Sequence, residues 1–146
     1  MPVFHAQNRH ELRSAYVSAW RKARSGETLT PLEAQIARVV AEHPEYQAML
    51  EGPPEVLDAQ FLPELGAENP FLHLGLHLAL REQVSTDRPT GIASLHAALS
   101  ARLESAHAAE HQMFEALGQV LWEAERSGRP PDEAAYLERL RRMIRD

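Results

Sequence analysis

The sequence of 146 residues contains no cysteine. This absence excludes disulfide bonds, thiolate zinc sites, iron–sulfur ligation and catalysis by a thiol, and it leaves the redox compartment open. Lysine is nearly absent as well, because Lys22 is the only one, and the formal net charge is −6 at pH 7. Since nucleic acids and anionic membranes attract basic surfaces, we expect neither of them to be a standing partner.

The sequence also lacks a long hydrophobic run. No stretch approaches the ~20 apolar residues that a transmembrane helix needs. Residues 1–5 lack the basic start and the apolar segment of a signal peptide, so we expect a cytoplasmic protein. The length fits one domain, which would bury roughly 68–70% of the surface of its unfolded chain.

Apolar residues recur at three- and four-residue steps through most of the chain, and no segment shows the alternation of a strand. The sequence therefore predicts a single all-α domain over residues 1–146, a bundle of about six or seven helices around a buried central helix (about 70–84). Residues 8–51 would form the N-terminal helices, residues 52–69 a connector, and residues 70–146 the histidine-bearing helices and the C-terminal helix. Residues 92–126 are expected to form either one long helix or two, with a break near Ser105.

Capping residues mark several helix starts. Thr30 begins a capping box, with a proline at the first helical position after it. Asn69 and Pro70 form a similar start for the central helix, and Asp132 suits the N-cap of the last helix. In the turn-rich loop at residues 85–91, Asp87 is expected to cap a helix end.

The predicted central helix has almost no polar face, and a helix that is apolar all round is a buried helix. His73 and His77 lie inside it, four residues apart, and therefore share one face. The rise between them is ~6 Å, so both imidazoles can reach one ion. Gly75 faces the other way and would let another helix approach closely. Buried polar groups need partners, which for this pair would be a backbone carbonyl, a carboxylate or a shared metal ion.

A second pair with the same spacing, His107 and His111, lies downstream, with Glu110 between them. Glu110 falls near the middle of an apolar face, where a carboxylate needs a cation, a proton or a strong donor. The segment matches the His-x-x-E-His inverzincin pattern, in which two histidines bind zinc and the glutamate acts as a base. The match is short and predicts shared local chemistry only. The alternative for Glu110 is a salt bridge with an arginine such as Arg81.

Other titratable residues are expected to lie outside the site. Glu104 precedes His107 by three residues and would approach it only if residues 92–126 form one continuous helix. On such a helix His96 would lie ~16 Å from His107, too far to share an ion. The remaining histidines are expected to be peripheral: His5, His10 and His43.

Several ordered motifs resemble a known bacterial family. They are LTPLE at residues 29–33, HPEY at 43–46, NPFLHLGLH at 69–77, TDRPTG at 86–91, and HAAEH at 107–111 followed by Trp122. Together they extend over nearly the full length, and the chain is identified as a member of the family called domain of unknown function number eighteen forty-one. The resemblance implies a small, soluble, cytoplasmic bacterial protein. It supplies no catalytic residues.

The two histidine pairs lead to a first hypothesis, a metal-binding helical protein. The ligands would be His73, His77, His107 and His111, with Glu110 as a further ligand or as a catalytic base. Nitrogen ligation suits zinc, copper, nickel or iron, and an added carboxylate favours iron, manganese or zinc, so we expect iron or zinc first. An open coordination position would support redox or hydrolytic chemistry on a small-molecule substrate that the sequence does not identify.

Two rival hypotheses need no metal. One is a non-catalytic interaction or assembly module, such as a homodimer, with a buried hydrogen-bond network of histidine and glutamate. The other is acid–base catalysis by His111 and Glu110. The discriminating feature is the distance between ring nitrogens, because ligands of one ion must each lie ~2 Å from it.

Overall fold

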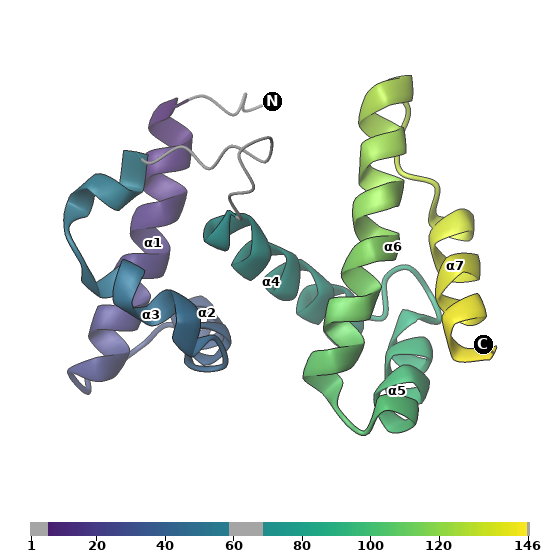
Figure 1. Cartoon of the computed structure of the whole chain (residues 1–146), viewed down its shortest axis with the longest axis horizontal. Helices are drawn as coiled ribbons and strands as arrows, with labels where there is room; N and C mark the ends of the chain where they lie inside the picture. The colour runs from purple at the N-terminus through teal and green to yellow at the C-terminus, as the bar shows by residue number, and fades with distance from the viewer. Residues whose placement is uncertain (1–5, 59–68, 146) are drawn as a thin grey trace. The chain divides into compact units, whose positions relative to one another are not determined.

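The computed structural model describes residues 6–58 and 69–145 (Figure 1). These residues form seven α-helices and one 3-10 helix, with no strand among them, so the prediction of an all-α fold is confirmed. The elements are α1 (Ala6–Arg24), α2 (Pro31–Ala41), α3 (Pro44–Glu51), η1 (Pro54–Asp58), α4 (Pro70–Thr86), α5 (Ile92–Leu103), α6 (Ala106–Ser127) and α7 (Glu133–Arg145). Most of the predicted connector, from residue 59 to residue 68, lies outside the described residues.

Contacts along the chain group the residues into two compact units, residues 1–78 and residues 79–146. The boundary falls inside α4, so this helix contributes its N-terminal half to the first unit and its C-terminal half to the second. Each unit is described below by itself. The expectation that residues 1–146 form a single domain stays a prediction.

The predicted caps are present. Thr30 Oγ1 accepts a hydrogen bond from the Glu33 amide at 3.1 Å, and the Glu33 carboxylate accepts from the Thr30 amide at 2.9 Å. Asn69 Oδ1 accepts from the first free amides of α4, and Asp132 Oδ1 accepts from an amide in the first turn of α7 at 3.0 Å. Asp87 Oδ1 accepts from two amides at the start of α5. Side-chain acceptors satisfy amides that a helix start otherwise leaves without a partner.

Residues 92–126 form two helices rather than one. Glu104 ends α5 in the left-handed backbone region, with φ 57°. Ser105 then has extended backbone, and its Oγ accepts from the Ala108 amide at 3.0 Å as the N-cap of α6. A residue in the left-handed region cannot continue a right-handed helix, so α5 ends here and α6 begins as a separate helix.

The core of the first unit lies between α1, α2, α3 and the start of α4. Its buried residues are Ala19, Ile36, Val39, Val40, Tyr46, Leu50, Phe71 and Leu74. Arg13 on α1 is buried beside this core. Its guanidinium lies 4.8 Å from the centre of the Phe71 ring and donates to the Leu57 carbonyl in η1. Through Arg13, α1 therefore contacts both η1 and the beginning of α4.

Along α4, burial follows one face rather than the whole circumference. Phe71, Leu74, His77 and Leu80 are buried, whereas Leu72 is 61% exposed. The expectation of a helix buried on every side is therefore corrected. A stretch without polar residues buries only the face that its neighbours cover, and single exposed apolar side chains are common on protein surfaces. Among the helices in the described ranges, none combines the length and apolarity needed to cross a membrane.

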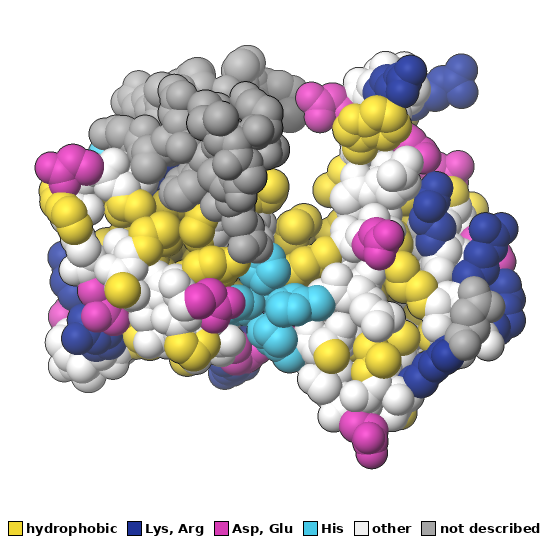
Figure 2. Space-filling view, in the orientation of Figure 1, with side chains coloured by type: hydrophobic (Ala, Val, Ile, Leu, Met, Phe, Trp, Pro, Cys, Tyr) yellow, Lys and Arg dark blue, Asp and Glu magenta, His cyan; other side chains and the backbone are white. Residues whose placement is uncertain are grey.

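In the second unit, α5, α6 and α7 pack on one another. The buried hydrophobic side chains on these three helices are Ile92, Leu99, Ala109, Met113, Ala116, Leu117, Val120, Tyr136 and Leu140. Arginine side chains gather along the edge of this unit that α7 forms (Figure 2). On α7, the side chains of Arg141, Arg142 and Arg145 lie within salt-bridge distance of Glu138. These pairs are exposed, and exposed pairs contribute little to stability.

Ser100 on α5 provides a stability test within this unit. Its Oγ is buried and has no hydrogen-bond partner among the described residues. A buried hydroxyl without a partner is unfavourable, and alanine is the better helix former. We expect Ser100→Ala to raise the free energy of unfolding by about 1 kcal/mol, measured by urea unfolding. The matched control is Ser105→Ala, which removes a cap and should lower the same quantity by about 1 kcal/mol. If both variants changed the free energy of unfolding equally, the result would contradict the interpretation of Ser100 as a buried hydroxyl without a partner among the described residues.

Candidate metal centre

His43 lies between α2 and α3, and its side chain is fully buried. Its Nδ1 lies 2.8 Å from the Val39 carbonyl oxygen. A carbonyl oxygen can only accept, so Nδ1 carries the proton and donates, and in the neutral ring Nε2 then carries the lone pair. A hydrogen bond from the other ring nitrogen to a carbonyl is the usual way in which a protein orients a histidine that ligates a metal.

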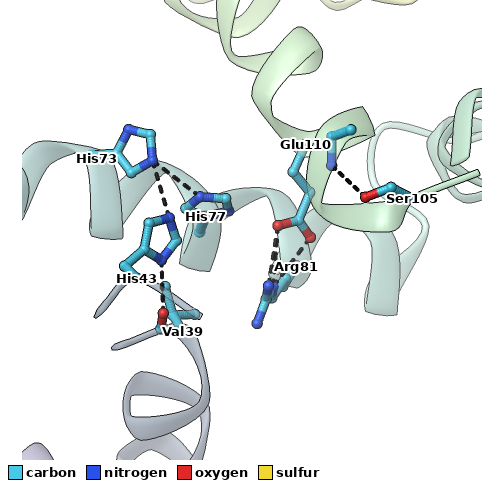
Figure 3. Close-up of polar contacts among 8 residues, drawn as sticks. Val39, His43, His73, His77, Arg81, Ser105 and Glu110 are labelled. Atoms are coloured by element: carbon cyan, nitrogen blue, oxygen red, sulfur yellow. Dashed lines mark hydrogen bonds and ion pairs between the residues drawn. The ribbon is translucent and has the colours of Figure 1, made fainter. Parts of the chain in front are cut away.

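The α4 histidines point toward the same place (Figure 3). His73 Nε2 lies 3.2 Å from His43 Nε2, and His77 Nε2 lies 3.2 Å from His73 Nε2. The ring centres of His43 and His77 are 4.5 Å apart. His77 is fully buried and His73 is partly buried. We call His43, His73 and His77 the histidine cluster; all three residues belong to the first unit.

The ring protons limit the hydrogen bonds that these nitrogens can make to one another. Because His43 Nε2 carries a lone pair, the proton of its 3.2 Å contact must come from His73 Nε2. That nitrogen then has no lone pair left for His77, so its one proton is shared between two acceptors. A cation among the three nitrogens would instead use a lone pair from every ring.

The spacing of the nitrogens also suits a metal ion. Bonds of ~2.05 Å to two nitrogens 3.2 Å apart enclose an angle of about 103° at the ion. This angle is close to tetrahedral. Three protein nitrogens in a tetrahedral arrangement leave one position for water, a substrate or a further ligand.

Side chains of the first unit pack against the cluster and against α4. The Tyr46 ring stacks on His43 with an interplanar angle of 4° and meets the edge of His73. On the opposite side of α4, Gly75 lets α1 approach, because a Cβ at this position would lie 3.4 Å from the Tyr16 hydroxyl. Burial raises the pKa of Tyr16, so its phenol stays protonated. The rings are therefore held by packing as well as by the Val39 carbonyl.

The prediction that His43 is peripheral was wrong, because this residue is at the centre of the cluster. A signal was present in the sequence. His43 follows Ile36, Val39 and Val40 at three- to seven-residue steps and so continues the apolar stripe of α2. The proline that follows ends the helix, but it does not move the side chain away from the core. The exposed His10 does lie outside the cluster, and His5 is outside the described residues.

The second histidine pair lies in the second unit, on the first turns of α6. The rings of His107 and His111 have centres 4.3 Å apart, so the predicted shared face is present. His107 is partly buried and His111 is exposed. The sequence prediction that these two residues bind the same ion as His73 and His77 stays a prediction.

Glu110 forms a buried ion pair with Arg81, the alternative that the sequence allowed. Arg81 Nε donates to Oε2 at 3.1 Å, and another guanidinium nitrogen donates to Oε1 at 3.2 Å (Figure 3). The Glu110 side chain is 6% exposed and that of Arg81 25%. Arg81 supplies the cation that the buried carboxylate needs, and metal ligation by Glu110 stays a prediction.

The remaining candidates lie apart from the histidine pairs. Glu104 is the exposed C-cap of α5, and the break at Ser105 removes it from the helix that carries His107. The Glu-x-x-His spacing therefore has no structural counterpart here. His96 also lies on α5 rather than α6, and its Nε2 is buried without a hydrogen-bond partner among the described residues.

These observations define an all-α protein with a buried histidine cluster. The chain belongs to the family described as Domain of unknown function (DUF1841), whose model matches residues 8–142. No curated protein and no solved structure matches the chain. The family prediction from the sequence motifs is thus confirmed.

Proposed function

We propose that this protein binds a transition-metal ion through the histidine cluster of its first unit. The observation that supports the proposal is the convergence of three Nε2 atoms with two contacts of 3.2 Å. Nitrogen ligands of this kind suit zinc, copper, nickel or iron. The ion would have one coordination position beyond the cluster, the arrangement from which metal-activated water or redox chemistry proceeds.

The decisive measurement is the metal content of untagged protein purified without added metal. We expect near-stoichiometric metal in the wild type and strong loss in His73→Ala, because the middle nitrogen of the cluster is removed. His73 is partly exposed, so this variant disturbs the core less than replacement of the fully buried His43 or His77. The matched control is His10→Ala, which removes an exposed histidine and should retain the metal.

A double variant, His107→Ala with His111→Ala, tests the wider set of ligands predicted from the sequence. Loss of metal from this variant as well as from His73→Ala would support a shared ion. Wild-type protein without metal, whose melting temperature changes neither with chelator nor with added metal, would overturn the proposal. The rival hypothesis of an assembly module with a buried polar network would then remain.

A further inference from the structure

The C-terminal end of α6 and the segment that leads to α7 form a surface recess whose lining residues belong to the second unit. Its volume is about 520 Å³, and the lining residues include Trp122, Arg126, Arg129 and Pro130. Trp122 is 53% exposed, although tryptophan is a highly buried residue on average. At this end of α6, basic side chains stand beside a hydrophobic one (Figure 2). The recess therefore combines an exposed aromatic ring with positive charge.

The two arginines of the recess can still donate hydrogen bonds to a ligand. The Arg126 guanidinium lies over the Trp122 ring, 5.1 Å from its centre. This cation–π contact orients the arginine through the face of the ring, which provides no oxygen acceptor for its N–H groups. Within the described ranges, no carboxylate lies within salt-bridge distance of Arg126 or Arg129. A carboxylate ligand would therefore meet two guanidinium groups that no described carboxylate neutralises.

The acceptors of the recess, in contrast, already have donors. Glu123 Oε1 accepts from Arg139 at 3.4 Å, and Asp132 Oδ1 accepts from an amide in the first turn of α7. The Ala124 carbonyl near the negative end of α6 accepts from the Arg129 amide at 3.2 Å. With Arg139 included, the site has three arginines and two carboxylates. Its hydrogen-bonding groups and its charge are therefore complementary to an acidic ligand.

We propose that this recess is a docking site for an acidic peptide segment of a partner protein. The carboxylates of the peptide pair with Arg126 and Arg129, because a guanidinium can donate two parallel hydrogen bonds to one carboxylate. An apolar side chain of the peptide lies against Trp122 and Pro130. Tryptophan and arginine are also the residue types that most often dominate the binding energy of protein interfaces. The inference goes beyond metal binding, since it uses residues of the second unit only.

The openness of the recess favours a peptide over a small molecule. Arg126, Arg129, Pro130 and Asp132 are all exposed, whereas a small-molecule pocket buries roughly 70–90% of its ligand. A peptide can lie across such an open surface, because its other side faces solvent or the rest of its own protein. The net charge of −6 opposes a long polyanion such as a nucleic acid. A segment with few carboxylates needs only the local arginines.

The test is a binding titration with the untagged full-length chain and a short fluorescein-labelled peptide that has glutamates on both sides of a leucine. The control peptide has glutamine at each glutamate position. We expect fluorescence anisotropy to show binding of the acidic peptide and binding on the order of tenfold weaker for the control. In a Trp20→Phe background, Trp122 is the only tryptophan left. Its emission should shift to shorter wavelength when the acidic peptide covers the ring.

Variants with the same change of charge locate the site. Arg126→Gln and Arg129→Gln should each weaken binding of the acidic peptide on the order of tenfold. The matched control is Arg88→Gln, which removes an exposed arginine outside the recess and should leave the affinity unchanged. Excess chelator should also leave the affinity unchanged, so this test is separate from that of the metal site.

Three results would overturn the docking site: equal binding of the two peptides, binding of neither, or a loss of affinity in Arg88→Gln as large as in Arg126→Gln. Displacement of the peptide by an equimolar amount of inorganic phosphate would also overturn it, because the recess would then be a site for small anions.

Discussion

Replacement of Glu110 by alanine is expected to lower the free energy of unfolding of the second unit by about 2–4 kcal/mol. The change leaves the Arg81 guanidinium without the carboxylate to which two of its nitrogens donate. Removal of one partner of a buried ion pair usually costs 3–5 kcal/mol. We expect a slightly smaller effect here, because the Arg81 side chain is 25% exposed and water can solvate it in part.

The two tryptophans make this measurement specific, since Trp20 lies in the first unit and Trp122 in the second. In a Trp20→Phe background, urea unfolding followed by fluorescence reports the second unit. Glu115→Ala on the same helix is the control, because Glu115 is exposed and its loss should change little. Glu110→Leu combined with Arg81→Met should recover most of the lost stability. If Glu110→Ala unfolds like the wild type, the ion pair makes no net contribution to the stability of this unit.

Local chemistry is the part of the fold that the sequence predicted best. The caps at Thr30, Asn69 and Asp132 were found because each depends on a hydrogen bond between residues no more than three positions apart. The all-α class followed from periodicity, which also depends on neighbouring residues. The pairing of Glu110 with Arg81 was foreseen only as an alternative, because several cations could have approached that carboxylate.

Features that depend on distant parts of the chain were predicted poorly. His43 was placed outside the site because its neighbour in the cluster, His73, is distant in the sequence and is brought to it by the fold. Leu72 was expected to be buried because the sequence shows its polarity but not which neighbours cover it. The division into two units inside α4 has no sequence marker, since the helix is continuous across it.

Metal binding is expected to stabilise the first unit in particular, because the histidine cluster lies within it. An ion that binds only the folded state at 100 times its dissociation constant adds about 2.7 kcal/mol to the free energy of unfolding. In a Trp122→Phe background, Trp20 reports this unit, and it packs against the core that contains Val39 and Leu74. Urea unfolding with metal and with excess chelator should therefore differ by about this amount.

The same comparison in the Trp20→Phe background shows how far the effect extends. If the cluster alone holds the ion, the Trp122 signal should shift much less than the Trp20 signal. Comparable shifts of the Trp20 and Trp122 signals would support the larger ligand set predicted from the sequence. In that case, replacement of His107 and His111 should abolish the shift of the Trp122 signal. If neither metal nor chelator changes the free energy of unfolding of the first unit, the result would contradict the metal site.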